Sequence, residues 1–163
     1  MKEEDVGFEY GSCLCRNVSY CLTNRPLIIH CCHCTYCQRQ SGSAFAINAY
    51  IETRYVKLIT GELENSKIPT SSGSGQEIYR CNRCRVTTWS HYLSVKKPQN
   101  FVFIRVGTLD RPENFLPDIH IYTSSKQPWV VIPHGVASFP NFYNAKEHWR
   151  PESLDRLKIE LDA

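Results

Sequence analysis

The sequence predicts a mainly β protein with a few short helices and one helix near the C-terminus. Three observations support this fold class. Apolar residues alternate with polar or small ones over several short segments, which is typical of strands that bury one face. Residues 101–104 form a continuous apolar run, Phe-Val-Phe-Ile, which is typical of a strand buried on both faces. Helical spacing of apolar residues is clear only near the C-terminus.

Length and composition set the limits for this fold. The chain has 163 residues, of which 42% are hydrophobic, so we expect residues 1–163 to form a single domain with a substantial core. Its net charge of +3 comes from 19 basic and 16 acidic residues scattered along the chain, which does not indicate nucleic-acid binding. Residues 1–5 are charged, and no segment approaches the length of a membrane span. We therefore expect a cytoplasmic protein without membrane contact.

Alternation places two of the predicted strands. Their apolar members are Val18, Tyr20 and Leu22 in the first strand, and Phe45, Ile47, Ala49 and Ile51 in the second. The low-complexity residues 71–75 are typical of a flexible surface loop between strands. Between residues 111 and 144 the chain contains five prolines, and each removes a hydrogen-bond donor from the backbone. Regular strand pairing should therefore be interrupted in this stretch.

Two segments have the features of helices. Residues 35–41 can form a short helix that Gly42 ends, because glycine is common just after a helix C-terminus. At about residues 151–161, an apolar stripe with helical spacing follows Pro151, which suits the first helical position. The members of this stripe are Leu154, Leu157 and Leu161. This second helix should cover the sheet or contact a partner subunit, so a homo-oligomer is one expectation.

Seven of the nine cysteines fall into three tight groups. The groups are Cys13 and Cys15, then Cys32, Cys34 and Cys37, then Cys81 and Cys84. Disulfide frameworks are typical of small secreted chains, and nothing here directs secretion, so reduced thiols that hold a metal are the better interpretation. Four cysteines around zinc make a closed structural site, whereas three leave a coordination position for water or substrate. The count suggests one closed and one open zinc site, which indicates an enzyme.

The spacing within each group suits metal binding. Side chains at i and i+2 of an extended strand point to the same face, so Cys13 and Cys15 can reach one ion. A gap of two residues, as between Cys81 and Cys84, forms a tight turn that wraps two sulfurs around one ion. The middle group combines both spacings within six residues. Three convergent thiolates in so short a segment are a specific indication of a metal site.

Spacing alone leaves two assignments of cysteines to sites open. In the first, the first and third groups together close a structural site, and the middle group forms the open site. In the second, the two C-x-x-C turns form a zinc ribbon, and the remaining cysteines are buried as small apolar residues. The ribbon would use Cys34, Cys37, Cys81 and Cys84. It leaves three well-spaced cysteines without a role.

Several sequence blocks occur in an order typical of a known family. They are Gly11-Ser12-Cys13-Leu14-Cys15, Cys32-His33-Cys34-Thr35-Tyr36-Cys37-Gln38-Arg39, Gly42-Ser43-Ala44-Phe45 and Cys81-Asn82-Arg83-Cys84. Further blocks are Gly107-Thr108-Leu109-Asp110, Pro117-Asp118-Ile119-His120-Ile121-Tyr122 and Pro128-Trp129. On these blocks, which span about the first 130 residues, the sequence resembles the glutathione-dependent formaldehyde-activating enzymes and their relatives, which include centromere protein V.

The resemblance implies a fold, a reaction and a cofactor. It implies the first cysteine assignment, two zinc ions per chain, and the β fold of the Mss4-like proteins over a core of about residues 7–135. It also implies a carbon–sulfur lyase that reversibly forms or cleaves S-hydroxymethylglutathione from glutathione and formaldehyde, or a related thiol–aldehyde adduct. A thiol at the open position would have a lowered pKa and would attack an aldehyde beside it. The alternative is a non-catalytic zinc module that binds glutathione, protein or nucleic acid.

Two residues are candidates for substrate contacts in such a site. Arg39, two residues past the middle group, could pair with a glutathione carboxylate through its planar guanidinium. His120 could carry a proton, because the usual pKa of histidine lies near neutrality. Arg16 and Arg85 depart from the family pattern, which has glycine at both positions. If these positions require a positive φ, each arginine costs on the order of 1 kcal/mol.

Other residues near the cysteines have structural interpretations. His33 lies between two ligand cysteines and should point away from the ion, whereas His30 shares the alternation of Cys32 and is the alternative ligand. Cys21 and Cys31 should be packing thiols. Three aromatic residues should lie in the core or a pocket wall rather than form a base-stacking surface. They are Trp89, Tyr92 and Trp129.

Overall fold

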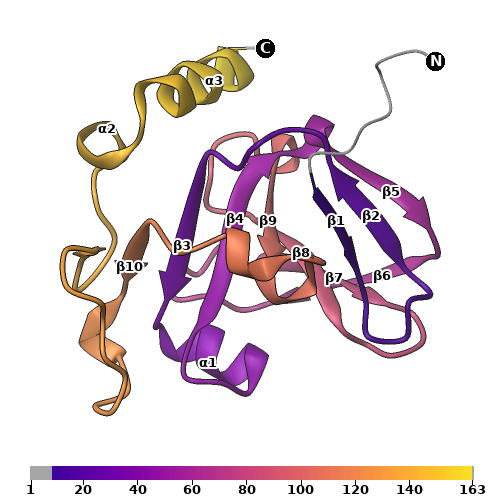
Figure 1. The fold of residues 1–163 in the computed structure, drawn as a ribbon, viewed down its shortest axis with the longest axis horizontal. Helices are drawn as coiled ribbons and strands as arrows, with labels where there is room; N and C mark the ends of the chain where they lie inside the picture. The colour runs from indigo at the N-terminus through magenta and orange to yellow at the C-terminus, as the bar shows by residue number, and fades with distance from the viewer. Residues whose placement is uncertain (1–8, 163) are drawn as a thin grey trace.

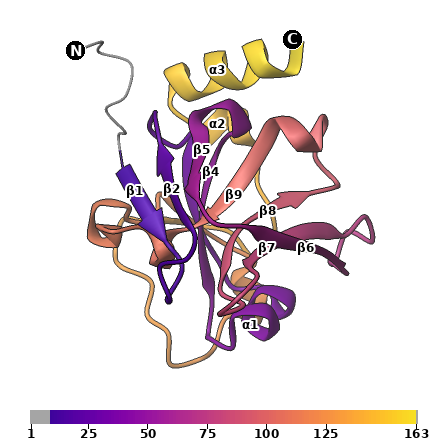
Figure 2. The same ribbon diagram turned by 90° about the vertical axis from the view of Figure 1, so that its right-hand side faces the viewer.

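The computed structural model of the protein describes residues 9–162 and shows a mainly β fold of two sheets with few helices (Figures 1 and 2). The small antiparallel sheet contains β1 (Glu9–Ser12), β2 (Ser19–Leu22) and β5 (Val56–Thr60) in the order β1-β2-β5. The large mixed sheet runs in the order β11-β10-β3-β4-β9-β8-β7-β6. Its strands are β3 (Ile28–Cys32), β4 (Ala46–Glu52), β6 (Leu63–Ile68), β7 (Gln76–Cys81), β8 (Thr87–Tyr92), β9 (Phe101–Arg105), β10 (Ile119–Ile121) and β11 (Ala137–Ser138). The predicted fold class is confirmed.

Three α-helices accompany the sheets. They are α1 (Thr35–Ser41), α2 (Ala145–His148) and α3 (Pro151–Asp162). In both views α1 lies at one end of the β structure and α3 at the other (Figures 1 and 2). Within residues 9–162, no helix is long and apolar enough to cross a membrane. The charged residues 1–5, on which the expectation of a cytoplasmic protein partly depends, lie outside the described range.

Strand β4 lies at the centre of the large sheet, between β3 and β9. On one face Ile51 packs with Tyr20 of β2, which joins the two sheets. On the other face the ring of Tyr50 meets that of Trp149 at 5.8 Å between centroids. The alternation predicts only one buried face, and it is wrong in this respect. The second face is covered by a segment about 100 residues further along the chain, which no local pattern connects to β4.

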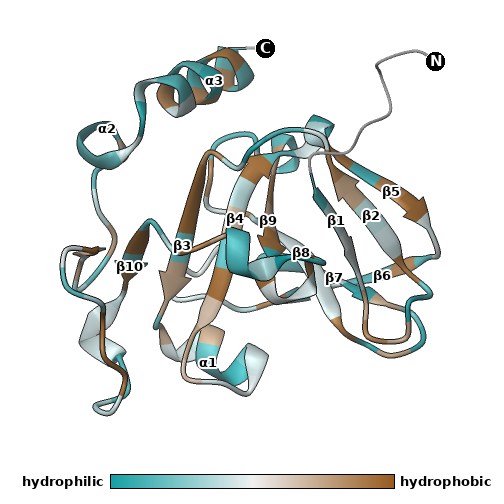
Figure 3. Cartoon of the chain, in the orientation of Figure 1, coloured by the Kyte–Doolittle hydropathy of each residue, from teal (hydrophilic) through white to brown (hydrophobic). Residues whose placement is uncertain are grey.

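Strand β9 is buried as the continuous apolar run predicts. Phe101, Val102 and Ile104 are each at most 1% exposed, and β3 and β9 stand out in brown as apolar in Figure 3. Burial of a large apolar side chain stabilises the fold by about 1.5–3 kcal/mol. Strand β1 also requires a residue without a side chain opposite Tyr20 of its neighbour β2. A Cβ atom on Gly11 would lie 2.5 Å from the ring of Tyr20.

The proline-rich stretch forms only short strands, as predicted. The three residues of β10 pair in parallel with β3 on one side and with the two residues of β11 on the other. The remainder consists of turns and of short 3₁₀ helices such as Pro112–Asn114 and Thr123–Ser125. Although β10 is short, its register places His120 opposite Cys31 of β3. A histidine from late in the chain is therefore brought beside the middle cysteine group.

Helix α3 covers one end of the central strands. Its leucines Leu154, Leu157 and Leu161 pack on the core cluster that contains Leu27 and Phe101. Arg156 anchors the helix, because its guanidinium donates to both carboxylate oxygens of Glu52 at 2.9 and 2.5 Å. The hydroxyl of Ser153 also donates to the carbonyl oxygen of Leu27 at 2.7 Å. The apolar stripe of α3 therefore packs on its own chain, the first of the two roles expected for it.

Candidate metal centres and the adjoining cavity

A cluster of four thiols joins the small sheet to the large one. Cys13 and Cys15 follow β1, and Cys81 and Cys84 frame the turn between β7 and β8. The Sγ atom of Cys15 lies 3.6 Å from that of Cys13 and 3.8 Å from that of Cys81. A tetrahedral zinc ion with bonds of about 2.3 Å to sulfur keeps its sulfurs about 3.8 Å apart. The donor set and its spacing therefore fit a closed tetrahedral site.

Left-handed backbone positions close both turns of this cluster. Arg16 has a φ of 57° and Arg85 a φ of 63°. Their N–H groups donate to the carbonyl oxygens of Cys13 and Cys81, at 3.0 and 3.1 Å. The N–H of Arg83 points at the Sγ of Cys81 at 3.4 Å. The condition stated for a strain at these two arginines, a positive φ, is met, and both turns nevertheless form.

A cluster of three thiols lies where β3 ends and α1 begins. Cys32 is the last residue of β3, Cys34 caps the N-terminus of α1, and Cys37 lies within the helix. One Sγ from each lies within 4.8 Å of the others, and within residues 9–162 no histidine, carboxylate or further cysteine completes this group. Cys32 and Cys37 are buried, and Cys34 is half-buried. The donor set fits a soft metal ion with one coordination position left for another ligand.

The sequence of α1 holds these thiols in place. The Sγ of Cys34 accepts the N–H of Cys37 at 3.3 Å, which caps the first turn. Gly42, with a φ of 64°, ends the helix, so the helix has the predicted bounds. Gln38 ties the helix to the protein, because its Nε2 donates to the carbonyl oxygens of His33 and Ser125 at 2.7 and 2.8 Å. A short helix with both ends fixed keeps the cysteine geometry defined.

Hydrogen bonds within the three-thiol cluster favour a thiolate on Cys34. Donation from the thiols of Cys32 and Cys37 lowers the pKa of Cys34 to about 3. The same bond to Cys34 raises the pKa of Cys32 well above its usual range. A thiolate is the form of cysteine that binds metal. Cys34 is therefore the thiol of this cluster that most readily takes the form that binds a cation.

The two C-x-x-C turns lie in different clusters. Cys34 and Cys37 belong to the three-thiol cluster, and Cys81 and Cys84 belong to the four-thiol cluster. A zinc ribbon requires all four sulfurs around one ion. The ribbon, the second of the two assignments open from spacing, is therefore not the arrangement in this fold. The identity and number of the metal ions stay a prediction.

A third cluster of potential ligands was not predicted from the sequence. It consists of Cys31, His33 and His120, all buried. The Nε2 atom of His33 lies 2.9 Å from Nδ1 of His120 and 3.5 Å from the Sγ of Cys31. His33 thus points away from the three-thiol cluster, as expected, and His120 is hydrogen-bonded inside the protein. Local spacing can pair Cys31 with His33, which stand at i and i+2, but it gives no sign of His120, which is 87 residues from His33.

A cavity of about 370 Å³ adjoins the three-thiol cluster, and Cys32 forms part of its wall. Tyr92, also in the wall, holds its hydroxyl 3.9 Å from the Sγ of Cys37. Burial raises the pKa of Tyr92 well above its usual value of 10, so the hydroxyl keeps its proton. Residues 70–72, at the start of the loop between β6 and β7, close the cavity from another side. This cavity is the natural place for a ligand of the cluster.

Arg105 is a charged residue near the site that the sequence did not single out. It is the last residue of β9 and directly follows the apolar run. Its guanidinium donates to the side-chain oxygens of Asn48 and Gln40, the latter at 2.5 Å. Its positive charge favours the ionised forms of Cys37 and Tyr92 and so opposes part of the rise in their pKa. The only sequence sign of this role is a charged residue at the end of a strand that is otherwise apolar.

The other predicted site residues lie in different surroundings. Arg39 is exposed on α1 and, like His120, is not among the residues that line the cavity. His30 does line it, but its Nε2 lies 2.6 Å from the hydroxyl of Tyr143. Trp89 is buried in the core, as expected. Trp129 is 72% exposed, so its expected place in the core or a pocket wall is wrong.

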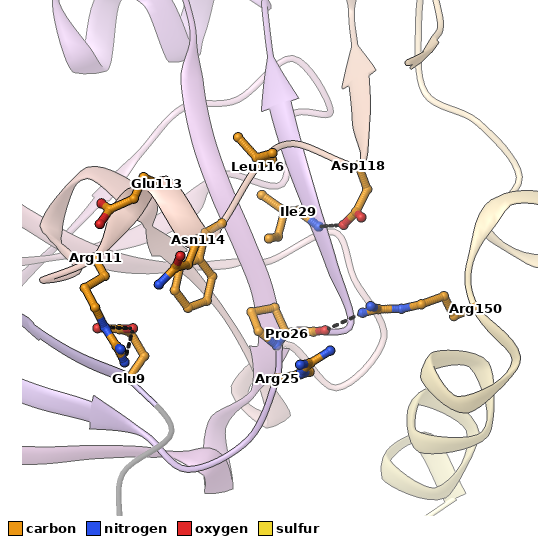
Figure 4. A pocket seen from close by; sticks show the side chains of 11 residues that line it. Glu9, Arg25, Pro26, Ile29, Arg111, Glu113, Asn114, Leu116, Asp118 and Arg150 are labelled. Carbon is orange, nitrogen blue, oxygen red and sulfur yellow. Dashed lines mark hydrogen bonds and ion pairs between the residues drawn. The ribbon is translucent and has the colours of Figure 1, made fainter. Parts of the chain in front are cut away.

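A larger cavity of about 650 Å³ lies away from all the cysteines (Figure 4). It contains several charged side chains, but they bond within the protein. Glu9 pairs with Arg111 at 3.0 Å, and Arg150 donates to the carbonyl oxygen of Pro26 at 3.1 Å. Asp118 accepts the backbone N–H of Ile29 at 2.8 Å, as the dashed lines in Figure 4 show. The smaller cavity therefore remains the candidate site.

Comparison with known proteins assigns the chain to a family. No curated protein matches its sequence. A crystal structure of a Rhodobacter sphaeroides protein, a Northeast Structural Genomics target, has 18% identity and a TM-score of 0.46, and the match covers 62% of this chain and 87% of that one. The family model described as glutathione-dependent formaldehyde-activating enzyme matches residues 9–125, a range that contains all three cysteine groups. The chain therefore belongs to the family of glutathione-dependent formaldehyde-activating enzymes.

Proposed function

We propose that this protein is a zinc-dependent carbon–sulfur lyase that reversibly joins a thiol and an aldehyde. The resemblance implies S-hydroxymethylglutathione as the adduct, and a related adduct is included in the proposal. One observation carries it, namely a three-thiol cluster that borders a cavity and to which residues 9–162 add no fourth ligand. A purely structural zinc site has four protein ligands and does not need an adjoining cavity.

Two sets of cysteines would hold the metal. Cys13, Cys15, Cys81 and Cys84 would hold a structural zinc ion, and Cys32, Cys34 and Cys37 would hold a second one. Held by these three thiolates, the ion would supply a free coordination position for a small-molecule thiol and a lowered pKa for that thiol. In this proposal the cavity wall beside Cys32 orients the bound thiol toward an aldehyde, so that proximity supplies much of the acceleration.

Residues around the cluster support the addition step. A bond forms between the thiol sulfur and the aldehyde carbon, the π electrons of the carbonyl move to its oxygen, and this oxygen gains one proton to replace the one that the thiol lost. Tyr92, with its proton retained, donates a hydrogen bond to that oxygen as charge develops. Arg105 offsets part of the negative charge that three thiolates bring to the site. Cleavage of the adduct follows the same path in reverse.

The first test measures metal content. The wild-type protein should contain two zinc ions per chain, and Cys34→Ser should contain one while it keeps its circular dichroism spectrum. Cys21→Ser is the matched control, because Cys21 is a buried thiol outside all three clusters. It should retain two ions. A content of one ion that does not change in Cys34→Ser would refute the open site.

The second test measures the rate of adduct formation by exchange NMR. The zinc-loaded protein should speed the reaction of a thiol with formaldehyde above the spontaneous rate, and Cys34→Ser should abolish the excess. Tyr92→Phe should lower it by about 100-fold or more, because a hydrogen-bond donor to a developing oxyanion is lost. If wild-type protein binds thiols but never exceeds the spontaneous rate, the protein is a binding module.

A further inference from the structure

The cavity beside the three-thiol cluster has an uncharged wall. None of the described residues that line it is an aspartate, glutamate, lysine or arginine. A thiol substrate must place its sulfur near Cys32, so the remainder of the molecule meets this wall. The chemistry of the wall therefore determines which thiols bind, through the part of the thiol molecule other than its sulfur.

Four of the residues that line this wall are aromatic. The rings of Tyr92 and Phe103 meet edge to face at 5.0 Å between centroids. Tyr122 and Phe142 form a second pair at 6.4 Å. Rings arranged in this way favour contact with another ring or with a branched aliphatic group. The cavity thus suits an apolar ligand.

Neutral polar groups complete the wall. Thr70, Ser71 and Ser72 contribute hydroxyls from the loop between β6 and β7, and Ser94 contributes one from the segment after β8. Hydroxyl groups can donate to or accept from an amide, an ester or an alcohol. They cannot neutralise a carboxylate. The polar part of the wall therefore also fits an uncharged ligand.

The nearby cations do not reach into the cavity. Arg39 is exposed on α1 and lies outside the wall. Arg105 is not among the residues of the wall, and its terminal nitrogens already donate to Asn48 and Gln40. His30 is in the wall, but its Nε2 lies at hydrogen-bond distance from Tyr143. Glutathione has two carboxylates, and transfer of a carboxylate from water without a partner is costly.

We propose that the thiol used by this protein is a neutral thiol with an aromatic or branched aliphatic body, and that glutathione is a poor substrate. The inference rests on the proposed function, because it takes the three-thiol cluster as the place where the sulfur binds. It differs from that function in naming the class of thiol. A cavity of about 370 Å³ is large enough for such a molecule.

The test compares thiols that differ in charge. N-acetylcysteine and its methyl ester share one reacting group and differ in one carboxylate, and benzyl mercaptan is compared with glutathione. For each thiol, the rate of adduct formation with formaldehyde is divided by its spontaneous rate. The zinc-loaded full chain should favour the ester over the acid, and benzyl mercaptan over glutathione, by at least about tenfold, as expected when a carboxylate is left without a partner.

A designed cation should reverse this preference. Val95 lies in the wall, on the segment that follows β8. Val95→Arg should raise the relative rate with glutathione by about fivefold or more and lower that with benzyl mercaptan, since a guanidinium pairs with carboxylates. Val95→Gln adds a long side chain without charge and should show no such gain. Binding of each thiol without aldehyde, measured by calorimetry, should follow the same order.

The outcomes separate this inference from the proposed function. If glutathione is accelerated as much as the neutral thiols, the inference is wrong and the lyase proposal stands. If no thiol reacts above its spontaneous rate but calorimetry shows the preference for neutral thiols, the lyase proposal fails and the ligand class is supported. If neutral thiols neither bind nor react better than glutathione, the inference is overturned.

Discussion

Arg16 and Arg85 occupy backbone positions that glycine would fill without strain. Both have a positive φ, and each closes the turn beside a pair of cysteines. In this region the Cβ atom comes too close to the following carbonyl oxygen, which costs about 1 kcal/mol per residue. Arg85 recovers part of this cost through an ion pair with Glu64, although an exposed pair contributes little. Arg16 is the cleaner of the two positions for an experiment.

Arg16→Gly should raise the free energy of unfolding of the zinc-loaded protein by about 1 kcal/mol, because the strain is relieved. Urea denaturation followed by circular dichroism measures the change. Arg16→Ala is the matched control, since it removes the same side chain but keeps the Cβ atom. It should give no gain. An equal gain in both variants would mean that the arginine side chain, and not the backbone, is responsible.

Sequence reasoning found site residues that lie close together along the chain. Cys32, Cys34 and Cys37 share a strand end and one helical turn, so their spacing alone predicts that they converge. The resemblance, not the spacing, grouped the first pair of cysteines with the last. The spacing and the resemblance did not reveal the pairing of His33 with His120 or the position of Arg105. These two features depend on which strands become neighbours. Residues that meet through sheet topology leave no local pattern.

At the scale of elements, the ion pair of Arg156 with Glu52 holds α3 in addition to its leucines. Glu52, at the end of β4, is fully buried, and both of its carboxylate oxygens accept from Arg156. Arg156 also donates to the carbonyl oxygen of Arg25 at 2.9 Å. One side chain thus connects the helix to the central strand and to the segment before β3. Removal of only one partner leaves a buried charge unpaired.

Arg156→Leu should lower the free energy of unfolding by roughly 3–5 kcal/mol, the usual cost of breaking a buried pair from one side. Thermal and urea denaturation measure the loss. Lys158→Leu removes an exposed cation from the same helix and should cost less than about 0.5 kcal/mol. Addition of Glu52→Gln to Arg156→Leu should recover part of the stability. If it recovers none, the loss comes from packing and not from the unpaired carboxylate.

The helices were predictable because their signals are local. Gly42 ends α1 and Pro151 begins α3, as the sequence indicates, and the leucine stripe faces the core. The burial of β4 on both faces was not predictable in the same way, since Trp149 covers its second face from a distant part of the chain. The small sheet was not predictable for the same reason, because β5 pairs with β2 across more than thirty residues of intervening chain.

At the scale of the whole molecule, several histidines are buried without charge. His30 is 3% exposed, and burial lowers its pKa from 6.5 to about 4. Burial also lowers the pKa of His33 to about 4 and lowers that of His120. In the unfolded chain these side chains bind protons near pH 6.5, so between about pH 6.5 and 4 the unfolded state binds more protons than the native state. Stability is therefore greatest above pH 6.5 and falls as the pH drops through this range.

His30→Gln should flatten this dependence. In the wild type, His30 alone accounts for a loss of up to about 3 kcal/mol between pH 6.5 and 4. Urea denaturation at several pH values in this range measures the slope for both proteins. Because both carry the same cysteines, acid release of metal contributes equally and cancels in the comparison. His148→Gln changes an exposed histidine and should keep the wild-type slope. Equal slopes for all three proteins would contradict the prediction.

The separation of the two thiol clusters along the chain has a consequence for folding order. Cys32, Cys34 and Cys37 lie within six residues, so this cluster can assemble from one strand end and one helical turn. The four-thiol cluster joins Cys15 to Cys81 across 66 residues, and contacts of such separation form late because a long loop must close first. During synthesis the three local thiols also leave the ribosome well before Cys81. Metal present at that stage therefore meets the three-thiol cluster first and the four-thiol cluster last.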